Sequence, residues 1–186
     1  MTAVLTRAVT YADGVLDAVT PQLLSRPTPC HAWDLRMLLE HAEESLAALQ
    51  EGITAHRVAV RPAHPTSGAS SAAALVSGFR RRATALVHAS AQADGDSPVT
   101  VGGRPVLLSC LLTVGALEIA VHAWDISQAC GPSLPIPDEP ATELLAQARL
   151  LVPRLGRHPL FAAPAPALPR STSSDRLTAY LGRPAR

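Results

Sequence analysis

A carboxylate and an imidazole lie four residues apart in the segment ALEIAVHAWD, residues 116–125. On a helix, Glu118 and His122 lie one turn apart on the same face, and Asp125 follows three residues later on that face. A second imidazole, His41, stands in the segment LLEHAEE. Two imidazoles and one carboxylate suit a divalent metal that is held by three protein ligands and keeps one position open. An open position is typical of catalytic metal sites rather than structural ones.

Each of these side chains also has an interpretation that involves no metal. An isolated histidine such as His41 is more often a core-edge residue bonded to a backbone carbonyl. Glu118 lies among apolar residues, so its carboxylate needs a proton or a cationic partner, and an arginine or the imidazolium of His122 would serve as well as a metal. Asp125 is either a residue that orients an imidazole or a bound water, or a surface aspartate near a helix end.

Helical periodicity indicates the elements that must position these residues. Apolar residues recur at helical spacing in four long segments, 2–19, 34–50, 72–91 and 107–130. Asp34 is a typical N-cap for the second segment, and Gly131 with the proline after it ends the fourth. We therefore expect an all-α fold, with four long antiparallel helices around one core.

Smaller elements are predicted around and after these helices. Val99 and Val101 before two glycines indicate a small hairpin near 99–105. A Pro/Ser/Gly-rich connection occupies 61–71, and a fifth helix is expected over 140–155. The stretch 158–186 reads as a Pro-rich tail with a short terminal helix, which Ser173 or Ser174 would cap. We expect the whole chain, 1–186, to form a single domain with this tail packed on it.

Composition excludes several classes of function. The chain has 186 residues, 47% of them hydrophobic, which is enough for one well-buried domain. Its net charge of +1 gives no reason to expect binding to nucleic acid or to an anionic membrane. The one basic run, residues 80–82, fans around a helix and reads as a solvated face. The apolar stretch 106–121 is too short to span a bilayer and predicts a buried core helix.

Cysteine spacing and the N-terminal segment predict a cytoplasmic location. The three cysteines, Cys30, Cys110 and Cys130, are widely spaced and form no CxxC pair, so we expect reduced thiols. The first residues carry Asp13 and Asp17 and lack the apolar region of a signal peptide.

Three segments in series resemble a known family. They are TPCHAWDLRMLLEH (28–41), EIAVHAWDISQACG (118–131) and DRLTAYLGRPAR (175–186). They are similar to the metal-binding domain of mycothiol-dependent maleylpyruvate isomerases, and more closely to its short stand-alone members, within the DinB-like superfamily. The isomerases carry an extra C-terminal domain that supplies a catalytic arginine, whereas this sequence ends at Arg186.

The resemblance implies an up-down four-helix bundle with a mononuclear site, usually zinc, with nickel or iron as alternatives. The ligand positions of the family fall on His41, Glu118 and His122. The aspartate that is implicated in catalysis in the isomerases falls on Asp125. Cys30 precedes the N-cap of the second helix, roughly 10 Å along the axis from His41, so we expect the open metal position to be clear of it.

The function that the resemblance implies is a metal-dependent isomerase or thiol transferase. It would use a low-molecular-weight thiol such as mycothiol to isomerise or S-conjugate a small electrophilic substrate. A thiol-independent lyase, hydrolase or cyclase acting on a specialised metabolite is a second hypothesis, because the same site can activate water. A metal-binding module without turnover is a third. We expect a small-molecule substrate, no nucleic-acid or membrane partner, and leave a homodimer open.

Overall fold

The computed structural model describes residues 2–30, 33–59, 71–131, 133–157, 161–168 and 170–183. These residues group into two compact units, Met1–Ser133 and Leu134–Arg186. Most of the connection expected over 61–71, and the first residues of the tail expected over 158–186, lie outside the described residues. The expectation of a single domain over 1–186 stays a prediction.

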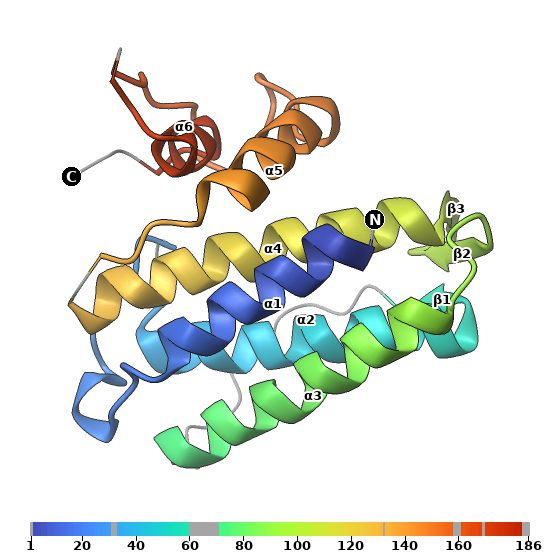
Figure 1. The fold of residues 1–186 in the computed structure, drawn as a ribbon, viewed down its shortest axis with the longest axis horizontal. Coiled ribbons are helices and arrows are strands. Elements are labelled where there is room, and N and C mark those ends of the chain that lie inside the picture. The colour runs from blue at the N-terminus through green and yellow to red at the C-terminus, as the bar shows by residue number, and fades with distance from the viewer. Residues whose placement is uncertain are drawn as a thin grey trace. The chain divides into compact units, whose positions relative to one another are not determined.

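The first unit is a bundle of four long helices. They are α1 (Thr2–Leu16), α2 (Leu35–Ala55), α3 (Ala72–Gln92) and α4 (Leu108–Cys130). Each helix packs against two others, because α4 lies against α1 and α2, and α3 lies against the same two helices. Figure 1 shows α1 and α4 running in one direction and α2 and α3 in the other. The predicted all-α bundle is confirmed. Its helices follow the order up, down, down, up, so the neighbouring helices α2 and α3 run parallel where antiparallel helices were expected.

A small sheet explains these directions. It contains β1 (Arg57–Val58), β2 (Pro98–Val101) and β3 (Arg104–Leu107). β2 and β3 form the predicted hairpin, and β1 pairs with β2 in parallel. Gly102 and Gly103 make the turn with φ angles of 55° and 81°, in the left-handed region that glycine favours. Because β1 follows α2 and β2 follows α3, both helices must end at this sheet, and α4 begins there.

The second unit contains α5 (Asp138–Leu151) and α6 (Ser173–Tyr180), which pack against each other. The sequence predicted Ser173 or Ser174 as the cap of α6, but the cap is Thr172. Thr172 Oγ1 accepts a hydrogen bond from the Asp175 N–H at 3.1 Å, and the Asp175 carboxylate accepts one from the Thr172 N–H at 2.9 Å. This reciprocal capping box satisfies two backbone donors at once, which a serine one residue later cannot do here.

Two other helix ends differ from the sequence prediction. α1 ends at Leu16 rather than near residue 19, and a short 3-10 turn, Pro21–Leu23, follows it. α5 begins at Asp138 and ends at Leu151, whereas the prediction was 140–155. Acidic residues in its first turn complement the positive end of the helix dipole and favour the earlier start.

The most apolar helix, α4, is buried on nearly every side. Among the described residues it alone is long and apolar enough to cross a membrane, judged by length and composition, and 72% of its most apolar window is buried inside the protein. Burial of this kind is typical of the core helix of a globular protein.

Glycines allow α2 and α4 to approach each other closely. A Cβ atom on Gly115 of α4 would lie 2.5 Å from Cδ1 and 2.7 Å from Cδ2 of Leu49 on α2. A Cβ atom on Gly52 of α2 would meet the Cδ2 atom of Leu111 on α4. Contacts this short do not occur between real side chains, so the two helices rely on the missing side chains at both positions.

We predict that Gly115→Ala destabilises the protein, whereas Gly14→Ala does not. Both changes add helix propensity, worth about 1 kcal/mol. A Cβ atom at Gly14 on α1 meets nothing within 4 Å, whereas one at Gly115 meets the buried side chain of Leu49. Urea unfolding should therefore place Gly115→Ala about 1–3 kcal/mol below Gly14→Ala in free energy of unfolding. Equal stabilities would contradict the close approach of α2 and α4.

Candidate metal centre

The start of α2 is fixed by a tight loop and a side-chain cap. Asp34 Oδ1 accepts a hydrogen bond from the Met37 N–H at 2.9 Å, which confirms the predicted N-cap. Before it, the Thr28 N–H donates to the Trp33 carbonyl at 3.1 Å, and Thr28 Oγ1 donates to the same carbonyl at 3.0 Å. These bonds place the Trp33 ring with its centroid 4.5 Å from that of His41, which lies two turns inside α2.

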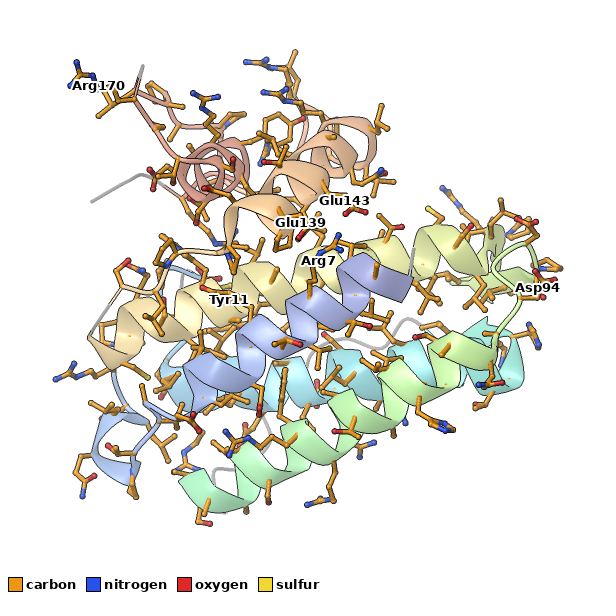
Figure 2. The ribbon with its side chains drawn as sticks, in the orientation of Figure 1. Arg7, Tyr11, Asp94, Glu139, Glu143 and Arg170 are labelled. Carbon is orange, nitrogen blue, oxygen red and sulfur yellow. The ribbon has the colours of Figure 1, made fainter. Side chains whose placement is uncertain are left out.

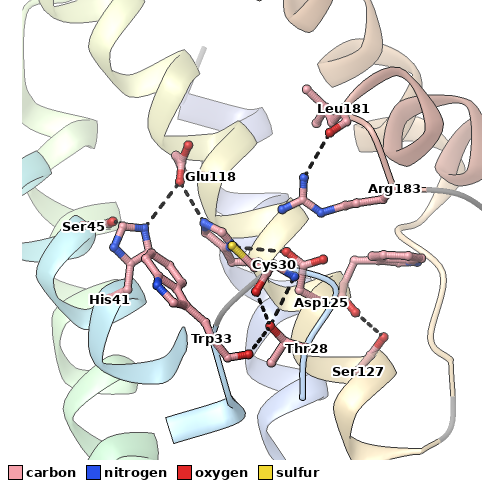
Figure 3. A network of polar contacts seen from close by, with 12 residues as sticks. Thr28, Cys30, Trp33, His41, Ser45, Glu118, Asp125, Ser127, Leu181 and Arg183 are labelled. Atoms are coloured by element: carbon pink, nitrogen blue, oxygen red, sulfur yellow. Dashed lines mark hydrogen bonds and ion pairs between the residues drawn. The ribbon is translucent and has the colours of Figure 1, made fainter. Parts of the chain in front are cut away.

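Three candidate ligand atoms converge between α2 and α4. Oε2 of Glu118 lies 3.1 Å from Nε2 of His122 and 3.9 Å from Nε2 of His41. The candidate ligand atoms of the three residues all lie within 4.8 Å of one another. Figure 3 shows the Glu118 carboxylate reaching toward His41, with Trp33 beside the same imidazole. The structure thus brings together the three residues that the sequence singled out.

The charges in this cluster depend on one another. Burial on its own raises the pKa of Glu118, but the contacts from His122 and His41 outweigh it and hold that pKa well below its usual range. Burial likewise lowers the pKa of His122, but its contacts with Asp125 and Glu118 prevail and raise it to about 9. Without a metal, the cluster therefore contains a carboxylate and an imidazolium at neutral pH.

This electrostatic arrangement is compatible with a divalent cation. Among the described residues the ion-pair partners of Glu118 are two imidazoles and no arginine. A divalent cation could replace the proton of His122 and would find two imidazole nitrogens and one carboxylate oxygen facing it. The donor set therefore fits a metal such as zinc, although an ion pair between Glu118 and the His122 imidazolium uses the same geometry. The ligand roles of His41, Glu118 and His122 stay a prediction.

Asp125 acts on the other side of the His122 ring. Its Oδ2 accepts a hydrogen bond from Nδ1 of His122 at 3.2 Å, and the residue is 0% exposed. A buried carboxylate on Nδ1 fixes the tautomer and the ring orientation, and it leaves Nε2 directed at the cluster. Of the two interpretations of Asp125, a surface residue is wrong, and its catalytic role stays a prediction.

A cavity of about 150 Å³ opens beside the cluster. Its walls come entirely from α2 and α4 and are mostly apolar: Ser45, Ala48, Leu49, Leu111, Val114, Gly115 and Glu118. Ser45 connects the two features, because its Oγ lies 3.5 Å from Nε2 of His41. Sequence reasoning missed both Ser45 and the cavity. The i,i+4 spacing of Ser45 to His41 was the available signal, whereas the cavity depends on tertiary packing.

Cys30 does not join the three converging residues. Among the described residues, the group whose ligand atoms lie within 4.8 Å of one another contains His41, Glu118 and His122 and no sulfur. The Cys30 N–H donates to Thr28 Oγ1 at 3.2 Å, and the Cys30 carbonyl accepts from the Trp33 N–H at 3.1 Å. These bonds hold the backbone of Cys30 within the loop before α2.

Comparison with known proteins identifies the family of this chain. Residues 5–127 match the family described as the mycothiol maleylpyruvate isomerase N-terminal domain, a range that includes all three converging residues. The chain belongs to this family. It is also 31% identical, over 97% of its length and 96% of theirs, to uncharacterized proteins from two strains of Mycobacterium tuberculosis, CDC 1551 / Oshkosh and ATCC 25618 / H37Rv. No solved structure matches the chain significantly.

The extent of these matches bears on the second unit. The family match ends at residue 127, before that unit begins at Leu134. The mycobacterial relatives, in contrast, align over nearly their whole length and so include it. This chain and its mycobacterial relatives therefore share a C-terminal part that the family match does not cover.

We predict that one divalent metal binds per chain and that His122→Ala removes it. Loss of one of three ligands leaves two protein donors, which hold a metal far more weakly. Elemental analysis of untagged protein should find close to one equivalent in the parent chain and little in the variant. His88→Ala is the matched control, because His88 is exposed on α3. Full retention of metal by His122→Ala would overturn the ligand assignment.

We predict that Asp125→Asn weakens metal binding while the protein still folds. The amide matches the carboxylate in shape but lacks its charge, so it stabilises the required tautomer of His122 less well. Loss of such a supporting contact typically costs 10–100-fold in metal affinity, which competition with a chelator would measure. An unchanged affinity would argue that Asp125 has no role in orienting His122.

Proposed function

We propose that this chain is a metal-dependent enzyme, with zinc as its metal, that uses a low-molecular-weight thiol such as mycothiol on a small electrophilic substrate. The observation that carries the proposal is the convergence of His41, Glu118 and His122 beside a cavity, in a chain of the mycothiol maleylpyruvate isomerase N-terminal domain family. The proposal includes a cytoplasmic location, where such thiols are kept reduced.

The residues of the site have separate roles in this proposal. His41, Glu118 and His122 would hold the metal, and Asp125 would keep the proton of His122 on Nδ1. A bound divalent metal with an open position would lower the pKa of a thiol enough to supply a thiolate at neutral pH. Trp33 would shield the His41 side of the site from water, because its ring lies against that imidazole.

The proposed chemistry needs no oxidant or reductant. The thiolate sulfur forms a C–S bond to one carbon of a conjugated alkene, and the π electrons move onto the conjugated carbonyl. Rotation about the new single bond, followed by cleavage of the C–S bond, returns the electrons and regenerates the alkene with the opposite geometry. In S-conjugation the C–S bond stays, and the neighbouring carbon takes up a proton instead. Asp125 would orient His122 from its buried position, and in the catalytic role predicted for it Asp125 would move a proton or hold the substrate.

The size and lining of the cavity beside α2 and α4 suit a small and largely apolar reactant. Its volume of about 150 Å³ is below the usual range for drug-sized ligands. Ser45 and Glu118 supply its polar atoms, while Ala48, Leu49 and Val114 contribute apolar wall. Such a cavity suits the reacting end of a compact molecule better than a whole sugar-containing thiol.

A second candidate function keeps the metal and omits the thiol. The same three ligands would allow a bound water to act as the nucleophile, which gives a hydrolase, lyase or cyclase. The observation that favours it is Ser45, since a hydroxyl 3.5 Å from Nε2 of His41 could donate to or accept from such a water. A metal-binding module without turnover remains the third hypothesis.

Cobalt substitution distinguishes the thiol-dependent function from its alternatives. We expect the cobalt protein to develop an intense sulfur-to-metal charge-transfer band only when a small thiol is added, because the open position then takes up sulfur. Cys30→Ser is the matched control and should behave like the parent chain. A band that exists before thiol is added, and disappears in Cys30→Ser, would contradict the proposal. A silent spectrum after thiol addition would favour water-based chemistry.

A further inference from the structure

The second unit contains a cavity of its own, far larger than the one beside α2 and α4. Its volume is about 540 Å³, within the range of small-molecule sites. Every wall residue belongs to Leu134–Arg186: Arg149, Arg154, Pro164, Ala165, Ala167, Arg176, Ala179 and Tyr180. The proposed metal chemistry uses none of them.

Three guanidinium groups line this cavity, and no carboxylate does. Arg149 comes from the end of α5, Arg154 follows that helix, and Arg176 lies on α6. Within the described part of the chain none of the three guanidinium groups forms a hydrogen bond or an ion pair with another residue. All three arginines are exposed, so solvent screens their mutual repulsion, but the wall that they share offers an anion three cationic groups without a carboxylate partner among the described residues.

Acidic residues of the second unit lie elsewhere. From Arg149 to the end of the sequence Asp175 is the one acidic residue, and its carboxylate is engaged in the capping box of α6. Figure 2 shows Glu139 and Glu143 at the edge of this unit opposite to Arg170. No acidic residue is among the residues that line the cavity, whereas three arginines are.

A buried fourth arginine adds positive charge behind the cavity wall. Arg157 is 7% exposed, and its Nε has no hydrogen-bond partner among the described residues. Its guanidinium lies 5.5 Å from the centroid of the Tyr180 ring and donates to the Tyr180 carbonyl at 2.8 Å. A buried cation without a carboxylate partner is costly, and a nearby anion offsets that cost.

The apolar part of the wall is held in place by backbone and side-chain contacts. The Ala165 N–H donates to the Ala179 carbonyl at 2.8 Å, which fastens the Pro- and Ala-rich segment to α6. The Tyr180 hydroxyl donates to the Val152 carbonyl at 2.6 Å and fixes the ring. At Gly182, with φ of 83°, a Cβ atom would lie 2.6 Å from the Ala162 carbonyl oxygen, so that segment passes close to the end of α6.

From this arrangement we infer that the second unit binds a small organic anion with two or more carboxylate or phosphate groups on an apolar body. The anionic groups would contact Arg149, Arg154 and Arg176, since guanidinium groups bind both carboxylate and phosphate in a bidentate way. The apolar body would lie against Ala179 and the Tyr180 ring. This site is independent of the proposed metal chemistry and stands if that proposal fails.

Calorimetric titration of the full-length chain at low salt tests this inference. The probes are trimesate, a benzene ring with three carboxylates, and citrate, which carries three carboxylates without a ring. We expect trimesate to bind more tightly than citrate, and Arg149→Gln, Arg154→Gln or Arg176→Gln each to weaken trimesate binding roughly 10-fold. Arg154→Lys should give a smaller loss, because it keeps the charge but not the bidentate geometry.

Arg104→Gln is the matched control, because Arg104 is exposed on β3 in the other unit and the substitution changes net charge equally. It should change trimesate binding by less than about 2-fold if distant exposed charges are largely screened. An equal loss in this control, or equal affinity for citrate and trimesate, would overturn the inference. So would a signal that His122→Ala removes and the three arginine variants leave intact, since the carboxylates would then be binding at the metal centre.

Discussion

A negative charge on the most apolar helix of the bundle governs how the first unit is organised. Contacts from two imidazoles hold the pKa of Glu118 low, and its own helix supplies only one of them, that of His122. The second partner, His41, must come from α2. The contact therefore depends on α2 packing beside α4 with the His41 side chain turned toward Glu118. Asp34 caps α2 and fixes the residue at which this helix begins.

The chain of polar contacts continues away from Glu118 in both directions. Asp125 supports His122 from within the same helix, and Ser45 and Trp33 approach His41 from its own helix and the preceding loop. Every one of these groups belongs to the unit that carries the family match, Met1–Ser133. The site can therefore be assembled by a part of the chain with its own core.

Local signals in the sequence were sufficient for the helices and for the pairing of Glu118 with His122. Glu118 and His122 are related by helical spacing alone, and Asp34 is a cap that any sequence reading would find. The pairing of His41 with Glu118 needed the family resemblance, because nothing local relates residues that lie on different helices. The direction of α3 was not readable, since it depends on which end of the bundle receives the parallel pair β1 and β2.

The cap of α6 and the two cavities show a different limit. Thr172, Ser173 and Ser174 are all good caps by type, and only the position of Asp175 decides among them. The three arginines that line the larger cavity are spread over 149–176 in the sequence, so no motif predicts that they lie together. Convergence of side chains from separate segments is a tertiary property, and periodicity carries no information about it.

The close approach of α2 and α4 at Gly115 has a consequence for how such a site can change in evolution. The helix pair that presents His41 and Glu118 is spaced by side chains that are missing, at Gly52 and Gly115. A larger side chain at Gly52 or Gly115, in the seam between α2 and α4, would move His41 and Glu118 apart. The distance between these two residues therefore depends on how the core packs. If the proposed metal binds there, substitutions deep in the seam would change its preferred identity without replacing any of the proposed ligands, a route to new chemistry that leaves the motif intact.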